Sequence, residues 1–89
     1  MTPDSKLRAL LEIAERLGLQ VRRVPLGGDG GGLCMVKGKR MLFVDLSADT
    51  ATQCDRTLAA LSSIPEIDSI FVIPELRECI NQVRNESVS

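Results

Sequence analysis

The sequence predicts an α+β domain in which three helices pack on a sheet of three or four strands. Three observations predict this class: apolar residues recur at helical spacing in three segments, a tight turn joins two apolar runs of strand length, and glycine or proline separates the segments. The expected order is helix, strand, hairpin, helix, an optional short strand and a last helix. We expect a mainly antiparallel sheet and one domain over residues 1–89, in which residues 84–89 form a disordered tail.

The first helix is expected at residues 4–17. Asp4 or Ser5 can cap its N-terminus, and Gly18 can end it by taking the left-handed position after the last turn. Leu19 would then fold back onto the helix. The apolar stripe of this helix consists of Leu7, Leu10, Leu11, Ala14 and Leu17.

The strands follow. Residues 19–24 alternate at first, and Pro25 ends this strand or confines it to an edge. The glycine-rich segment 27–32 then leads into two apolar runs, residues 33–36 and 41–46. We expect these two runs to pair as a hairpin.

The hairpin turn predicts a register. Gly38 at the first central position of a two-residue turn favours type II′. Val36 then lies opposite Met41, and Leu33 lies opposite Val44. Both faces of the hairpin are therefore apolar. One face carries Leu33, Met35, Leu42, Val44 and Leu46, and the other carries Cys34, Val36, Met41, Phe43 and, at its end, Asp45.

A second helix is expected from Ala48 or Ala51 to Ser62. The residues Thr50 to Gln53 fit a capping box, which predicts the helix start. The buried stripe consists of Ala51, Cys54, Leu58 and Leu61.

The C-terminal part begins with the apolar run Ile70–Ile73, which predicts either a fourth strand or an extended, buried connector. Pro74 at the first helical position and Glu75 in the first turn indicate a last helix, which frays from Arg84 onward. Its apolar stripe consists of Leu76, Cys79, Ile80 and Val83.

The composition excludes several function classes. The chain has no histidine, which removes the commonest general base, the commonest metal ligand and every Ser-His or Cys-His nucleophile pair. Cys34, Cys54 and Cys79 are an odd number with wide spacing, so we expect small core residues rather than a disulfide framework or a zinc site. We therefore expect no metal, no cofactor and no enzymatic activity.

Charge and hydropathy exclude two classes of binding partner, nucleic acids and membranes. The net charge is −1 and Phe43 and Phe71 are the only aromatic residues, so neither the positive charge nor the stacking platforms of nucleic-acid binders are present. No apolar run approaches the length that a membrane span needs. The polar N-terminus is unlike a signal peptide, and we expect a cytoplasmic protein that binds neither nucleic acid nor membrane.

The glycine-rich segment is the main candidate binding site. Its glycines lead into a strand rather than a helix, so it fits neither a phosphate loop nor a dinucleotide fingerprint. It is either a flexible connection between strands or a place where a ligand approaches the backbone. Neighbouring basic residues protect an edge or bind an anion. The candidate residues are Gly30, Gly31, Gly32, Cys34, Arg22, Arg23, Lys37, Lys39 and Arg40.

Cys34 and two carboxylates near the second helix suggest further sites, each with an alternative explanation. Cys34 directly follows the glycines and is the thiol that solvent would reach most easily, although a reactive thiol also needs a group that stabilises the thiolate. The carboxylates of Asp45 and Asp49 straddle the start of the second helix, where they would make a weak site for a hard cation. Capping of the helix explains Asp49 without a metal.

The segment from Gly31 to Gly38 reads Gly-Gly-Leu-Cys-Met-Val-Lys-Gly, and it resembles small bacterial proteins of unknown function with a G-G-x-C-x-x-x-G core. The order of helix, three strands and helix is also similar to the smallest zinc-peptidase domains, which carry H-E-x-x-H on the helix after the sheet. Residues 50–57 lack that motif. The resemblance therefore implies a shared scaffold without the metal site or the hydrolytic activity.

These observations favour an interaction module that self-associates or docks on another protein. The alternatives are a domain that binds a small molecule or an anion at residues 27–32, and a catalytically dead relative of a small metallopeptidase scaffold. A two-layer arrangement of so few elements leaves one apolar face of the sheet uncovered. We therefore expect a homo-oligomer, most simply a two-fold dimer.

Overall fold

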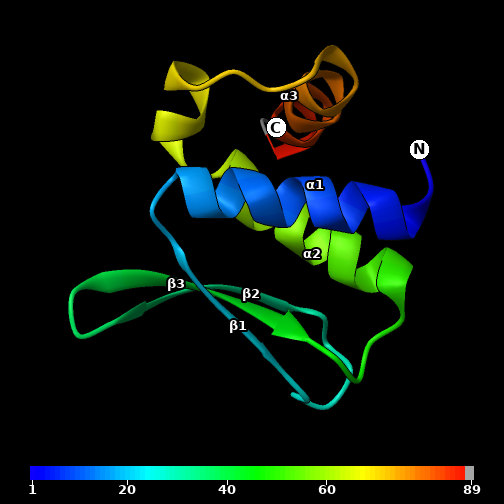
Figure 1. The fold of residues 1–89 in the computed structure, drawn as a ribbon, viewed down its shortest axis with the longest axis vertical. Helices are drawn as coiled ribbons and strands as arrows, with labels where there is room; N and C mark the ends of the chain where they lie inside the picture. Colours follow the sequence, from blue (N-terminus) through cyan, green and yellow to red (C-terminus); the bar gives the residue numbers. More distant parts are fainter. Residues whose placement is uncertain (88–89) are drawn as a thin grey trace.

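The computed structural model of the chain describes residues 1–87 and has its elements in three layers (Figure 1). The sheet forms the first layer, and α1 (Pro3–Arg16) and α2 (Thr50–Ser62) lie side by side on it. The helix α3 (Pro74–Ser87) packs on α2, on the side away from the sheet, and the short 3-10 helix η1 (Pro65–Ser69) connects the two. The predicted α+β class is confirmed.

The sheet has three strands in the order β1-β3-β2: β1 (Gln20–Val24), β2 (Gly31–Val36) and β3 (Lys39–Asp45). The prediction of a mainly antiparallel sheet is wrong for β1, because β1 runs parallel to the central strand β3 while β2 runs antiparallel to it. Since β1 and β2 lie on opposite sides of β3, the glycine-rich segment between them crosses the C-terminal end of β3. This crossing positions the candidate site.

The hairpin register differs from the prediction by two residues. The turn consists of Lys37 and Gly38, whose φ angles of 51° and 79° define a type I′ turn rather than type II′. Val36 therefore pairs with Lys39, and Cys34 pairs with Met41. Because side chains alternate with a period of two, this slip leaves every residue on the face that the sequence predicts.

The first helix is capped by Thr2, whose hydroxyl accepts a hydrogen bond from the Ser5 N–H at 3.2 Å, and not by Asp4 or Ser5. Its end is as predicted. Gly18 has a φ of +79°, and the Leu19 N–H donates back to the Ala14 carbonyl at 3.1 Å. Leu19 is buried as a result.

The second helix starts at Thr50, and Asp49 is its N-cap, accepting from the Thr52 N–H at 2.7 Å. The predicted capping box is absent because Gln53 instead donates its side-chain N–H to the Ala48 carbonyl. Ala51 is exposed, so it does not belong to the buried stripe, whereas the rest of that stripe is buried as predicted.

The connector Ile70–Ile73 is extended but forms no strand. Val72 is buried, while Phe71 is 72% exposed. Pro74 opens α3, and this helix continues to Ser87 instead of fraying at Arg84; residues 88 and 89 of the predicted tail lie outside the described residues.

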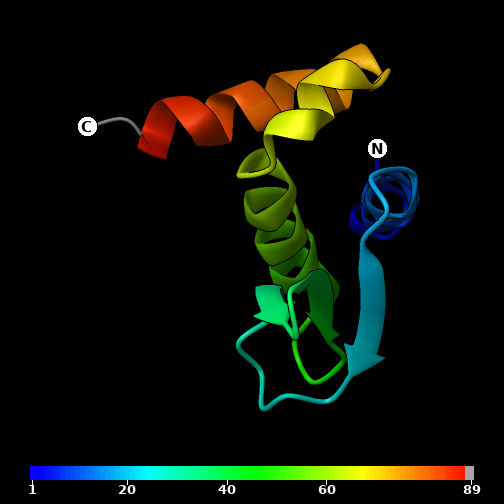
Figure 2. The same cartoon turned by 90° about the vertical axis from the view of Figure 1, so that its left-hand side faces the viewer.

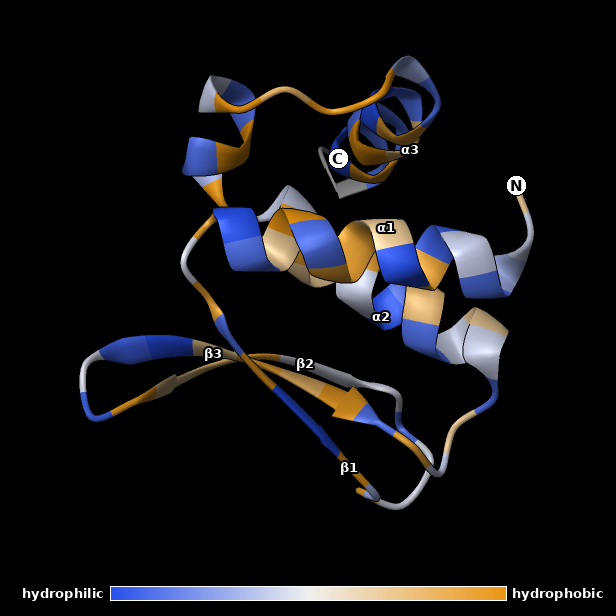
Figure 3. Cartoon of the chain, in the orientation of Figure 1, coloured by the Kyte–Doolittle hydropathy of each residue, from blue (hydrophilic) through white to orange (hydrophobic). Residues whose placement is uncertain are grey.

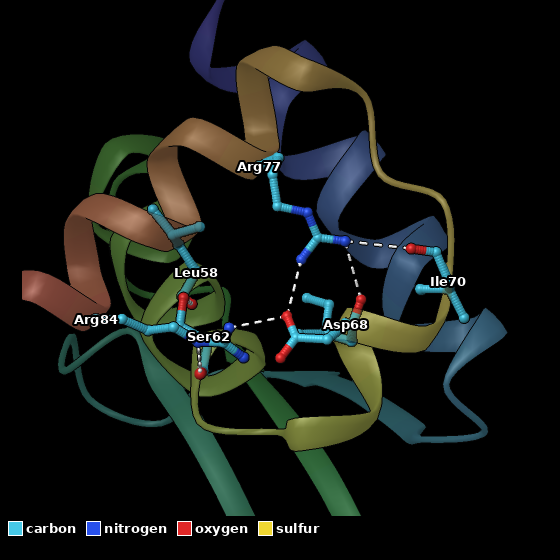
Figure 4. A network of polar contacts seen from close by, with 7 residues as sticks. Leu58, Ser62, Asp68, Ile70, Arg77 and Arg84 are labelled. Carbon is cyan, nitrogen blue, oxygen red and sulfur yellow. Dashed lines mark hydrogen bonds and ion pairs between the residues drawn. The ribbon is translucent and has the colours of Figure 1, made fainter.

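Two arginines of α3 hold it against η1 and the end of α2 (Figure 4). Arg84 donates to the Ser62 carbonyl at 2.9 Å and to the Asp68 carboxylate at 2.9 Å. Arg77 donates to the same carboxylate at 3.2 Å and to the carbonyls of Ile67 and Ile70. Arg84 is thus fixed on both sides, which explains why the helix does not fray there.

The core lies between the sheet and the helices. The buried side chains of β3 that face the helices are Leu42 and Val44, and Val21 and Leu33 of the flanking strands pack against the same core. Figures 1 and 2 show all three helices on this side of the sheet. The other side, which we call the open face, carries the side chains of Gln20, Arg22, Cys34, Val36, Met41 and Phe43.

No helix among residues 1–87 is long and apolar enough to cross a membrane.

Candidate functional site

The carboxylate of Asp45 organises the glycine-rich crossing. Asp45 is the last residue of β3 and is completely buried. Its Oδ1 accepts from the N–H groups of Leu26 at 2.7 Å and Ser47 at 2.9 Å. Its Oδ2 accepts from Gly28 at 2.6 Å and Gly30 at 3.2 Å. The glycine-rich segment is therefore a loop that hydrogen bonds of Gly28 and Gly30 tie to the end of the central strand.

These hydrogen bonds change the acidity of Asp45. Burial by itself would raise the pKa of this carboxyl group, because it disfavours the charged form. The backbone N–H groups of Leu26, Ser47, Gly30 and Gly28 outweigh burial and lower the pKa from 3.8 to about 2. Asp45 therefore carries a negative charge at neutral pH and supplies the anion that the loop binds.

The anion-binding version of the predicted site conflicts with this geometry. A ligand anion at the loop would need N–H groups that point outward, but those of Gly28 and Gly30 point to Asp45. The sequence does not reveal this, because the loop N–H donors lie 15 to 19 residues before Asp45. Asp49 caps α2 instead. Among residues 1–87, no three His, Cys, Asp or Glu side chains are grouped so that they could hold a metal ion.

Two of the candidate glycines are needed for close packing. A Cβ atom on Gly31 would lie 2.0 Å from the Phe43 carbonyl oxygen, and one on Gly30 would lie 2.5 Å from Cγ of Arg56. Gly30 is buried against α2. These two glycines therefore let the loop enter β2 close to β3 and α2, which is a structural role.

A hollow of about 390 Å³ opens on the outer side of the loop. Phe43 of β3 and Cys34 of β2 border it, and Leu26 and Asp29 of the loop lie beside it. Gly32 contributes no side chain, and a Cβ placed there would meet nothing within 4 Å. The hollow therefore has a mainly apolar lining, with Asp29 as its one charged residue among the described residues. Its complete lining is Leu26, Asp29, Gly31, Gly32, Leu33, Cys34 and Phe43.

The three thiols lie in different surroundings. Cys34 is exposed, Cys54 is buried and Cys79 is half-buried. Burial raises the pKa of the Cys54 thiol, which donates a hydrogen bond to the Pro3 carbonyl at 3.0 Å. The expectation of small core residues is confirmed for Cys54 and wrong for Cys34. Cys34 is the accessible thiol, which its place beside the glycines predicts, and it borders the hollow.

The structure does not bring the basic candidates together. Arg22 and Arg23 point to opposite faces of β1, Arg22 to the open face and Arg23 to a groove beside the acidic side of α1. Arg40 faces the helices and pairs with Glu66 at 3.2 Å. Lys37 and Lys39 remain exposed at the hairpin tip. A single anion site built from all five is therefore not formed.

Comparisons of the chain with protein-family models, with curated proteins and with solved structures give no match in any of the three.

Proposed function

We propose that this chain is a non-enzymatic interaction module that associates with a second copy of itself through its sheet. The observation that carries the proposal is the position of the helices, all of which lie on one side of the sheet (Figure 2). The free thiols, including the exposed Cys34, fit a reducing compartment such as the cytoplasm.

The open face has the chemistry of a contact surface. Phe43 is half-buried at its centre, and Cys34 and Val36 are exposed beside it. The hollow next to Phe43 adds further apolar surface. Complete burial of an exposed valine or phenylalanine side chain stabilises a complex by about 1.5–3 kcal/mol. Closed two-fold association is the commonest arrangement of identical chains.

A second candidate is a site for a small apolar molecule, which the hollow beside Phe43 favours. In this candidate the glycine-rich loop lines the binding site. It does not bind an anion there, because the N–H groups of Gly28 and Gly30 donate to Asp45. Native mass spectrometry of the purified chain separates the two candidates, because it reports a retained small molecule and the number of chains in the same spectrum.

The proposal is tested by placing a charge on the open face. We expect Cys34→Glu to raise the dimer dissociation constant at least about tenfold in sedimentation experiments, because it puts a carboxylate into the apolar contact. The matched control is Ala59→Glu, which makes the same change at an exposed position of α2, on the helix side of the molecule. An equal effect of both substitutions would show that Cys34 and the open face around it take no part in the contact.

A further inference from the structure

The two edges of the sheet differ in their protection against strand pairing. The edge strand β1 carries Arg22 and Arg23, and charged residues of this kind discourage pairing with another chain. The other edge strand, β2, has the sequence Gly-Gly-Leu-Cys-Met-Val and contains neither charge nor proline. Figure 3 shows blue residues in the middle of β1 and none along β2. Met35 and Val36 of β2 are 63% and 37% exposed.

The hydrogen-bond pattern identifies the backbone groups that β2 turns outward. The Asp45 N–H donates to the Gly30 carbonyl, and these residues continue the β2–β3 register, so they belong to a hydrogen-bonded pair of the antiparallel ladder. Such pairs alternate with pairs that do not bond each other. The N–H and C=O groups of Gly31, Leu33 and Met35 therefore point away from β3, toward the free edge.

We propose that β2 pairs antiparallel with β2 of a second copy, with Leu33 opposite Leu33 of that copy, so that two three-stranded sheets join into one. This inference rests on the proposed self-association and names the contact that holds it. In this register Gly31 lies opposite Met35 of the second copy, and every outward N–H and C=O of these positions meets a partner. Backbone pairing of this kind is a common mode of strand recognition.

Charge supports this register and this partner. Asp29 lies just before β2, and Lys37 lies just after it. With Leu33 at the two-fold axis, the Lys37 end of each strand lies beside the Asp29 end of the other. Opposite charges thus face each other twice, and a strand shifted along the edge would lose this match.

The hollow supports the same arrangement. On the open face, Cys34 of the second copy lies opposite Gly32, and Val36 of the second copy lies one step further toward the glycine loop. Both apolar side chains therefore border the hollow that Gly32, Leu26 and Phe43 enclose. Because Gly32 has no side chain, this end of the edge leaves room for them, and the contact is reciprocal.

The experiment removes an outward N–H without touching the inner ladder. Met35→Pro deletes the Met35 N–H, which faces the free edge, and Met35→Ala is the matched control that keeps it. We expect Met35→Pro to raise the dimer dissociation constant at least about tenfold in sedimentation velocity, because the bond is lost in both copies, and Met35→Ala to change it less than about threefold. Far-UV circular dichroism confirms that each variant is folded.

A second set of variants tests the register without depending on proline. At low salt, Lys37→Glu and Asp29→Lys should each raise the dissociation constant about threefold or more, and the double variant should return to within about twofold of the original chain. Additive weakening without this rescue would overturn the register.

Outcomes for the two proposals are distinct. A dimer that Met35→Pro leaves unchanged would overturn the edge pairing while self-association stands. A chain that remains monomeric without any substitution would overturn the proposed function itself.

Discussion

Asp45 has the most contacts of any single polar side chain in the candidate site, since it joins the end of β3 to the loop that crosses it. A carboxylate can accept from all of these N–H groups because it carries lone pairs on both oxygens and no proton. An amide of the same shape cannot do so. The loop conformation therefore depends on the charge of Asp45 and not on its size.

Asp45→Asn is the direct test of this dependence. One of the two oxygens becomes an NH₂ group, which faces two backbone N–H donors, so we expect a clear fall in the thermal midpoint at pH 7. Asp49→Asn, which can still accept the single Thr52 N–H, should lower the midpoint less. Equal losses in the two variants would contradict the special role of Asp45.

The pH dependence of stability gives a second prediction for the same residue. The pKa of Asp45 is depressed in the folded chain to about 2 from 3.8, so its contribution to stability is fully present above pH 4 and is lost as the pH falls toward 2. Urea unfolding at several pH values should show the stability gap between the original chain and Asp45→Asn narrowing over this range. A gap that stays constant down to pH 2 would refute the charge-based explanation.

Gly28 and Gly31 differ in the space that is available for a side chain. Gly28 and Gly31 both have positive φ angles, of 102° and 95°, but only Gly31 faces a backbone atom at the Cβ position. We expect Gly28→Ala to cost about 1–2 kcal/mol from the left-handed conformation. Gly31→Ala should cost about 3 kcal/mol or more, because it adds a clash with the Phe43 carbonyl. Denaturant unfolding of both variants measures the difference, and similar costs would show that the close approach is absent.

Thiol accessibility tests the burial of three residues at once. Cys34 is exposed, so it should react first with a thiol reagent in the native state, whereas the half-buried Cys79 should react more slowly and the buried Cys54 only on unfolding. Mass spectrometry of peptides after brief labelling identifies the modified residue. Labelling of Cys54 before Cys34 would contradict the packing of α2 against the N-terminal residues.

At the scale of elements, the sequence was informative about faces and less so about pairing. The hairpin faces are as predicted although the register is wrong, because the error is two residues and the strand period is also two. The turn type decides the register, and Lys37 takes a left-handed φ of 51° that is uncommon for a non-glycine residue. With only one glycine in the turn, the sequence does not reveal that the residue before it is also left-handed.

The third helix is longer than its sequence predicts because contacts distant in the sequence hold its C-terminal part. The bonds of Arg84 to Ser62 and Asp68 join residues far apart in the chain, and such bonds have no local signal. Arg84→Ala should therefore lower the free energy of unfolding by about 1–2 kcal/mol. Arg16→Ala, at an exposed position in the last turn of α1, should change it by less than about 0.5 kcal/mol. Chemical denaturation compares the two, and equal effects would contradict the anchoring role of Arg84.

At the scale of the whole molecule, composition and periodicity predicted the α+β class, and the structure confirms it. The direction of β1 could not be predicted, because it follows from the loop crossing the end of β3, and that crossing depends on the buried Asp45. The predicted site is only partly formed. Gly31, Gly32 and Cys34 lie together at the hollow, whereas the basic residues are dispersed over both faces and the hairpin tip.

The claim that the sheet joins two copies of the chain can be judged from the number of chains in the assembly. Multi-angle light scattering across a micromolar dilution series measures this directly. We predict a molar mass near twice the 9.7 kDa of one chain at the highest concentrations, falling toward one chain on dilution. A mass that stays at 9.7 kDa throughout would contradict the claim.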